Sequence, residues 1–209
     1  MFLLSDKIWF PPVDKASQDG LLAVGGDLSI ERLLLAYKSG IFPWYNEGEP
    51  IIWYSPDPRM VLFPNKLIIS KTMKKILGRG EFDVTFNQNF EEVITHCKNV
   101  SRGDQKGTWI TNEMQRAYTK LHKLGYAKSV EVWQDKTLVG GLYGIDLGTV
   151  FCGESMFSKV ANSSKVAFIY LVEKLKKENY SIIDCQVYTS HLASLGAEEI
   201  PRTEFLKYL

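Results

Sequence analysis

The sequence predicts an α+β protein in which helices flank a mixed sheet, with a small subdomain at the N-terminus. From about residue 80, strand-like runs alternate with runs of helical periodicity, whereas the first 60 residues are rich in proline and aromatic side chains. At 209 residues and 45% hydrophobic content, the chain can hold one large domain with a small companion. We therefore expect a small subdomain over residues 1–60 and a principal domain over residues 61–209.

The N-terminal segment contains one clear helix signal. In LSIERLLLAYKSG the apolar residues follow helical spacing, Ser29 is the expected N-cap, and Gly40 is the residue expected to end the helix. We expect the rest of residues 1–60 to be turns and aromatic side chains that lean on the larger domain. Trp44 lies in this part, in IFPWY.

The stretch LIISKTMKKILGRG predicts a basic helix that begins after Ser70. Its apolar residues point to one side, and its cations gather on the other. A run of charge is usually a solvated helix face. However, the chain is nearly neutral, with 25 Lys and Arg against 24 Asp and Glu, so four clustered cations also suit a phosphate-contacting surface. The four cations are Lys71, Lys74, Lys75 and Arg79.

The order of elements in the remainder resembles the acyltransferase fold shared by N-acetyltransferases and aminoacyl-tRNA-dependent peptidyl transferases. We expect, in order, the strand FDVTF, the helices NFEEVITHCKN and TNEMQRAYTKLHKLG, and the strands SVEVWQ, TLVGGLYGID and GTVFCGES. A long helix NSSKVAFIYLVEKLKKEN, the strand SIIDCQVY, a short helix HLASLG and a strand near EEI should follow. Thr111 and Gly125 should bound the second helix, with Met114, Ala117, Tyr118, Leu121 and Leu124 on its apolar face.

One segment argues against coenzyme A as an acyl donor. Acyl-coenzyme A enzymes of this fold hold the pyrophosphate on a glycine-rich loop at a helix N-terminus. The corresponding segment here is MFSKVANSSKVA, which contains no glycine. An acyltransferase built on this chain should therefore use another donor.

Three polar residues are the candidates for chemistry. Glu154 should lie where the strand GTVFCGES ends, beside Gly153, and Asp184 and Gln186 should share one face of SIIDCQVY because they are two residues apart. Paired carboxylates for glycoside hydrolysis are one interpretation, and a structural Asp–backbone bond is another. The intervening glutamine favours groups that orient an amine nucleophile or an acyl carbonyl.

Cysteine and histidine give weaker signals. The three cysteines lack paired spacing, and the three histidines follow no metal-ligand spacing, so we expect a reducing compartment, no disulfide framework and no metal. A Cys185–His191 nucleophile pair is disfavoured because strand alternation puts Cys185 opposite Asp184. No segment is long enough for a secretory leader or a membrane span, which indicates a cytoplasmic protein.

The motifs together resemble the leucyl/phenylalanyl-tRNA protein transferase family. The strings run from residue 20 to residue 202: GLLAVGGDLS, LLLAYKSGIFPWY, WYSPDPRMVLFP, GTWIT, SVEVW, LVGGLYG, FCGESMFS, DCQ and HLASLGAEEIPR. The resemblance implies an enzyme that transfers Leu or Phe, with Met a further candidate, from aminoacyl-tRNA to proteins bearing N-terminal Arg or Lys, marking them for N-degron degradation. It also implies an acyltransferase-like catalytic domain over 61–209, a cytoplasmic monomer, and no metal or organic cofactor.

The resemblance also implies roles for individual residues. Glu154 corresponds to the residue that meets the acceptor's basic end or amine, and Asp184 with Gln186 to the pair implicated in activating that amine. The basic helix corresponds to the family's tRNA-binding helix. The aminoacyl-adenosine pocket corresponds to Trp44, Trp109, Phe151, Met156 and Leu142, the last standing where some members carry Met.

Two other functions remain open from the residues alone. One is a different acyltransferase of this fold, acting on small amines or cell-wall peptides. The other is a non-catalytic RNA-binding protein that uses only the basic helix. The missing pyrophosphate loop weighs against coenzyme A chemistry, and the motifs GESMF and DCQ weigh against a simple binding module.

Overall fold

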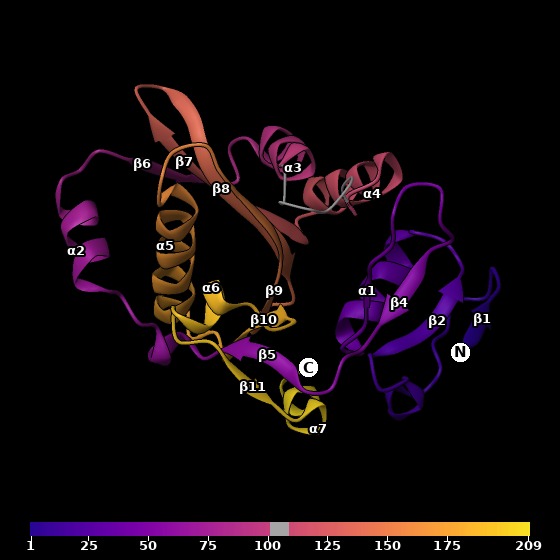
Figure 1. The fold of residues 1–209 in the computed structure, drawn as a ribbon. Helices are drawn as coiled ribbons and strands as arrows, with labels where there is room; N and C mark the ends of the chain where they lie inside the picture. Colours follow the sequence, from indigo (N-terminus) through magenta and orange to yellow (C-terminus); the bar gives the residue numbers. More distant parts are fainter. Residues whose placement is uncertain (101–108) are drawn as a thin grey trace.

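The computed structural model describes residues 1–100 and 109–209 and contains two sheets flanked by helices, which confirms the α+β expectation (Figure 1). Gly107 and Thr108 of the GTWIT motif lie outside the described residues. Among the helices that are described, none is long and apolar enough to cross a membrane.

The first 60 residues form a four-stranded sheet and a helix, although sequence patterns predict only the helix. The strands, in the order β1-β2-β4-β3, are β1 (Phe2–Leu4), β2 (Leu21–Gly25), β3 (Phe42–Pro43) and β4 (Ile52–Tyr54). They are too short to show alternation, so periodicity could not reveal them. The helix α1 (Ile30–Lys38) begins as expected, because the Ser29 hydroxyl accepts a hydrogen bond from the Arg32 N–H. Gly40 follows it with φ of +72°, a conformation that suits glycine.

The larger sheet has seven strands in the order β11-β5-β10-β9-β8-β7-β6. Neighbours are antiparallel except β9 and β10, which are parallel, so the sheet is mixed as expected. Sequence patterns miss β5, because four residues directly after Pro58 give no readable period. The strands are β5 (Arg59–Leu62), β6 (Asp83–Phe86), β7 (Ala127–Gln134), β8 (Thr137–Asp146), β9 (Val150–Ser158), β10 (Ile182–Gln186) and β11 (Glu198–Ile200).

Helices cover both faces of this sheet (Figure 1). The helices α3 (Phe90–Asn99) and α4 (Asn112–Lys123) pack on one face, and the long α5 (Ser163–Lys177) packs on the other. The basic helix α2 (Lys71–Gly78) lies beyond α5, as Figure 1 shows. The shorter helices are η1 (Val13–Lys15), η2 (Pro64–Lys66), α6 (Ser190–Ala193), α7 (Arg202–Phe205) and η3 (Leu206–Tyr208).

The caps predicted for the other helices are present. Ser70 caps α2 by accepting from the Met73 N–H, and Thr111 caps α4 by accepting from the Met114 N–H. Four of the five residues expected on the apolar face of α4 are buried. Leu124, the fifth residue, is 57% exposed, because it follows the last helical residue, where the chain turns away at Gly125.

The small sheet and the large one share a cluster of buried side chains. Tyr37 of α1 and Trp53 of β4 belong to the same cluster as Tyr118 of α4 and Tyr143 of β8. The expected boundary near residue 60 falls just after β5 begins, and it remains a prediction. The N-terminal segment therefore contributes side chains directly to the face on which α3 and α4 pack.

The strands β9 and β10 are paired over only the first part of β9. They pair only from Val150 with Ile182 to Cys152 with Asp184, after which β9 continues to Ser158. Glycine at position 144 of β8 is required here, because any Cβ would collide with the Cys152 carbonyl and the Phe151 ring. The divergence opens the sheet between two of its central strands.

Candidate functional site

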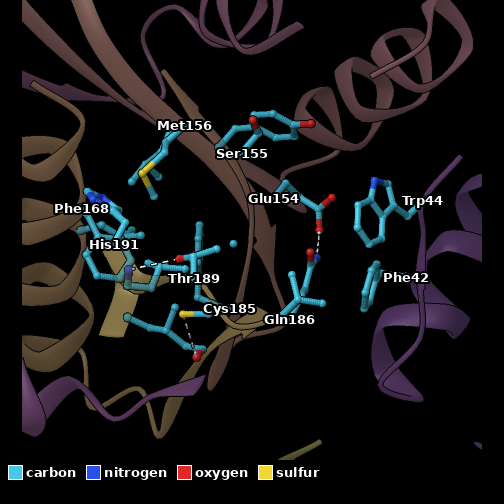
Figure 2. Close-up of a pocket in the computed structure, with 18 of the residues that line it drawn as sticks. Phe42, Trp44, Glu154, Ser155, Met156, Phe168, Cys185, Gln186, Thr189 and His191 are labelled. Atoms are coloured by element: carbon cyan, nitrogen blue, oxygen red, sulfur yellow. Dashed lines mark hydrogen bonds between the residues drawn. The ribbon is translucent and has the colours of Figure 1, made fainter. Parts of the chain in front are cut away.

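A cavity of about 390 Å³ occupies this opening, and the residues predicted to form a donor pocket line it. Most of its remaining wall is apolar and comes from β3, β8, β9, α5 and β10. Figure 2 shows Glu154 and Gln186 close to Trp44 and Phe42, with Met156 and Phe168 farther along the cavity. The five predicted pocket residues found in the wall are Trp44, Trp109, Leu142, Phe151 and Met156. The cavity thus combines an apolar slot with a polar end.

Glu154 lies in the middle of β9, so the expectation that the strand ends there is wrong. Against β8, Gly153 pairs with Gly144 and Ser155 with Tyr143, which leaves Glu154 as the extra residue of a β-bulge. A bulge redirects the side chain without ending the strand. The Glu154 carboxylate accepts a hydrogen bond from the Gln186 amide nitrogen at 2.8 Å and another from the Tyr118 hydroxyl at 3.1 Å.

The surroundings of Glu154 favour the protonated form of its carboxyl group. Burial raises the pKa of Glu154 to about 8, and the negative charge of Asp184 adds to this effect. Hydrogen bonds from Tyr37, Tyr118 and Gln186 oppose the rise. A carboxyl group with its pKa near neutrality can accept and release a proton at physiological pH.

Asp184 does not line the cavity. It is 1% exposed and accepts two hydrogen bonds from Arg59, at 2.7 Å from Nε and 2.6 Å from Nη2. Arg59 is equally buried; it also donates to the Gly40 carbonyl and lies over the rings of Phe42 and Phe205. This buried, bidentate ion pair joins β5 to β10.

The expectation that Asp184 and Gln186 share a strand face is wrong. The register of pairing with β5 shifts between these two residues, and Gln186 has φ of +66°. The alternation of side chains between the two faces of β10 therefore breaks at its last residue. Cys185 and Gln186 consequently both reach the cavity. Asp184 meets Gln186 through the backbone, by accepting the Gln186 N–H at 2.9 Å.

Sequence patterns missed three residues that hold this site together. Arg59 supports Asp184, and Tyr37 hydrogen-bonds Tyr118, which in turn donates to Glu154. A single arginine before the apolar run MVLF was the available signal for a buried ion pair. Nothing in the sequence distinguishes the two tyrosines from ordinary core aromatics.

The predicted cations of α2 lie apart from the cavity. Lys71, Lys74, Lys75 and Arg79 are exposed, while Met73 on the opposite side is buried. Arg79 follows the last helical residue and forms an ion pair with Glu81 at 3.6 Å. The three lysines form the exposed basic face of α2.

The described residues contain no cluster of His, Cys, Asp and Glu that could hold a metal ion. Cys185 lines the cavity, and burial raises its pKa, which favours the unreactive thiol. His191 also lines the cavity, and burial lowers its pKa. The groups placed for chemistry are therefore Glu154 and the amide of Gln186.

Comparison with known proteins gives consistent matches over almost the whole chain. A family model described as leucyl/phenylalanyl-tRNA protein transferase matches residues 61–209, and a model of the N-terminal domain of that protein matches residues 26–57. The leucyl/phenylalanyl-tRNA–protein transferase of Flavobacterium johnsoniae is 65% identical, over 100% of this chain and 99% of its own. That of Christiangramia forsetii is 61% identical over 100% of both chains. A solved GCN5-related N-acetyltransferase from Kribbella flavida is 11% identical with a TM-score of 0.41, covering 85% of this chain and 63% of its own.

Proposed function

The chain belongs to the leucyl/phenylalanyl-tRNA protein transferase family, and we propose that it transfers Leu or Phe from aminoacyl-tRNA to the α-amino group of proteins that begin with Arg or Lys. It is an aminoacyl-tRNA-dependent transferase. Met is a further donor that the apolar slot suits. We further infer a cytoplasmic monomer that directs its products to N-degron degradation.

One observation supports this proposal above the others: a carboxylate stands at the polar end of an otherwise apolar slot. Leu142, Met156 and Phe168 line the slot and suit an uncharged donor side chain. Glu154 meets the same cavity and suits a cationic acceptor. Its neighbour Trp44 is 40% exposed and available to stack on an adenine base.

The reaction needs little beyond positioning, because the tRNA ester is already activated. The amine nitrogen attacks the ester carbonyl carbon, a C–N bond forms, and the bond from that carbon to the ribose oxygen breaks. An ammonium that becomes an amide loses two protons, of which one ends on the ribose oxygen and one leaves. An α-amino group has a pKa of about 7.7–8.0, close to that of Glu154, so ionised Glu154 can accept the departing proton with little free-energy change.

Gln186 and Asp184 have different roles in this scheme. The Gln186 amide donates to Glu154 and borders the cavity, so it contacts the acceptor amine. Asp184 has no opening to the cavity and acts as a positioning residue, because its contact with Gln186 is the backbone N–H. This arrangement supports a structural Asp–backbone bond and dispenses with proton transfer through Asp184.

The exposed basic face of α2 suits the tRNA. Its three lysines point away from the buried Met73, and phosphates bind such a face through charge. Because α2 lies beyond α5 from the small sheet (Figure 1), the tRNA would pass over α5 to place its 3′ end in the cavity. Contacts of this kind position the ester without reading base sequence.

The test is transfer of radiolabelled Leu from Leu-tRNA to two model proteins that differ only in beginning with Arg or Ala. We expect labelling of the Arg protein only, and its loss of at least tenfold in Glu154→Gln. The matched control is Glu131→Gln, since Glu131 is a buried carboxylate on β7 that hydrogen-bonds Thr85 and Ser129 outside the cavity. Equal labelling of both proteins, or full activity of Glu154→Gln, would contradict the role of Glu154; binding of tRNA without transfer would indicate the RNA-binding alternative.

A further inference from the structure

Two fully buried tyrosines form a hydrogen-bond chain that ends on Glu154. Tyr37 of α1 is 2% exposed and Tyr118 of α4 is 0% exposed. Their hydroxyl groups are hydrogen-bonded to each other, and the Tyr118 hydroxyl donates to Glu154 Oε2 at 3.1 Å. The other carboxylate oxygen, Oε1, accepts from Gln186. Both oxygens of Glu154 are therefore held by donors that come from different elements.

The direction of the chain follows from counting protons. A tyrosine hydroxyl carries one proton, and an ionised carboxylate can only accept. When Tyr118 donates to ionised Glu154, its oxygen is left to accept, so the shared hydrogen bond must be donated by Tyr37. Burial raises the pKa of both tyrosines well above the ordinary value, so both stay protonated as this direction requires.

The hydroxyl groups are not explained by packing. Tyr37 and Tyr118 lie in an apolar cluster, and Tyr118 meets the Tyr143 ring edge-on at 5.7 Å. Phenylalanine would supply the same ring contacts without placing a polar group in that cluster. Burying a hydroxyl group costs free energy unless it is hydrogen-bonded, and the chain ending on Glu154 is the arrangement that compensates it here.

Other ionisable groups act on Glu154 as well. The charge of Asp184 on β10 raises its pKa, and Arg59 on β5 and Cys152 on β9 interact with its charge. Asp184 and Arg59 are paired with each other, and the charge of Asp184 still raises the pKa of Glu154. The hydroxyl groups from α1 and α4 and the Gln186 amide thus supply the hydrogen bonds that favour the carboxylate form.

We propose that Tyr118, supported by Tyr37, is a positioning residue that favours the ionised form of Glu154 and aims its carboxyl group into the cavity during transfer. The inference rests on the proposed function of Glu154 and adds the groups that set its charge state. It also gives the N-terminal segment a part in the chemistry, because α1 supplies the first hydroxyl of the chain.

The first test is the pH profile of kcat/KM for the Arg acceptor, at saturating Leu-tRNA, in wild type and Tyr118→Phe. Loss of one donor to the carboxylate should raise the pKa of Glu154 from about 8 to about 9. The ionised fraction then falls about tenfold at pH 7 and about twofold at pH 9, so the defect should shrink as pH rises. A merely structural role would lower kcat/KM by the same factor at every pH, and that result would overturn the proposal.

The second test does not depend on activity. With 13C-labelled glutamate carboxyl groups, NMR titration follows Glu154, whose signal is identified by its loss in Glu154→Gln. We expect a higher pKa of Glu154 in Tyr118→Phe and also in Tyr37→Phe, because each substitution removes a hydroxyl group whose hydrogen bonding lowers that pKa. The matched control is Tyr180→Phe, which removes a hydroxyl bonded to Asp146 at 2.7 Å and should leave the pKa of Glu154 unchanged.

The two tests separate the inference from the function on which it rests. Failure of wild type to transfer Leu contradicts the proposed function, whatever the NMR titration shows. Normal transfer with an unchanged pKa of Glu154 in Tyr118→Phe overturns only the role of the tyrosines. Circular dichroism of each variant establishes whether it folds. If Tyr118→Phe does not fold, Tyr37→Phe takes its place in both tests.

Discussion

Replacing Asp184 by Asn should lower stability strongly and activity only slightly. Asp184 and Arg59 are each 1% exposed, so the substitution leaves a guanidinium charge buried without its carboxylate. Breaking a buried ion pair from one side typically costs about 3–5 kcal/mol. The amide oxygen still accepts a hydrogen bond, and Arg59 keeps the Gly40 carbonyl and two ring faces, so we expect a loss of about 3 kcal/mol.

Activity should survive because the contact between Asp184 and Gln186 runs through the backbone. In Asp184→Asn, the amide oxygen of the new asparagine can replace the carboxylate Oδ1 as acceptor for the Gln186 N–H. We therefore expect less than a tenfold decrease in turnover at a temperature where the variant is folded. Loss of a group that transfers a proton typically costs about 10²–10⁴-fold.

Urea denaturation followed by circular dichroism measures the first effect, and steady-state transfer of Leu to the Arg acceptor measures the second. The double variant Arg59→Met/Asp184→Asn removes the orphaned charge and should be more stable than the sum of the single losses predicts, by at least about 1 kcal/mol. A single-variant loss below about 1 kcal/mol would refute the argument for a buried charge pair. If folded Asp184→Asn instead turns over about a hundredfold more slowly than wild type, the positioning role is refuted, because that loss is typical of a proton-transfer group.

Three further results are expected. Replacing Lys71, Lys74 and Lys75 together by Ala should weaken the salt dependence of tRNA binding: in filter binding, the slope of log K against log salt concentration should become shallower by about 2. The double variant Lys176→Ala/Lys177→Ala is the control and should keep the wild-type slope. An unchanged slope in the triple variant would mean that the tRNA binds elsewhere. In steady-state transfer, Trp44→Ala should raise the KM for Leu-tRNA about tenfold or more and leave the KM for the acceptor protein near its wild-type value. An unchanged KM for Leu-tRNA would mean that the adenosine lies away from this ring. In urea denaturation, Glu154→Gln should stabilise the protein more at pH 8.5 than at pH 5. The pKa of Glu154 is raised in the folded state, so the wild-type protein loses stability as pH rises from the pKa of Glu154 in the unfolded chain to about 8, and the glutamine variant does not. An equal effect at both pH values would mean that the pKa is not raised.

Local signals predicted the longer elements well. Ser29, Ser70 and Thr111 cap helices as expected, since a hydroxyl that satisfies a free N–H acts within one turn of chain. The strands of two to five residues in the first 62 residues were missed, because so few residues carry no readable alternation.

The sequence by itself determined the family, the mixed α+β architecture and most of the predicted residues that gather at the cavity, although Asp184 is not among them. Glu154, Gln186, Trp44, Trp109 and Met156 all line that cavity as motif reasoning anticipated. Those assignments needed no knowledge of how the strands meet.

Only the tertiary structure decided how the polar groups are used. The bulge at Glu154 arises where β9 pairs with the preceding strand β8, and the register shift before Gln186 arises where β10 pairs with β5, far earlier in the chain. Both irregularities change the faces that simple alternation predicts. Arg59 is 125 residues from its partner Asp184 along the chain. Tyr37 is 81 residues from its partner Tyr118, and Tyr118 is 36 residues from Glu154. Hydrogen bonds and ion pairs act over about 3 Å of space, and no local pattern of residues records which distant side chain will be brought within that reach.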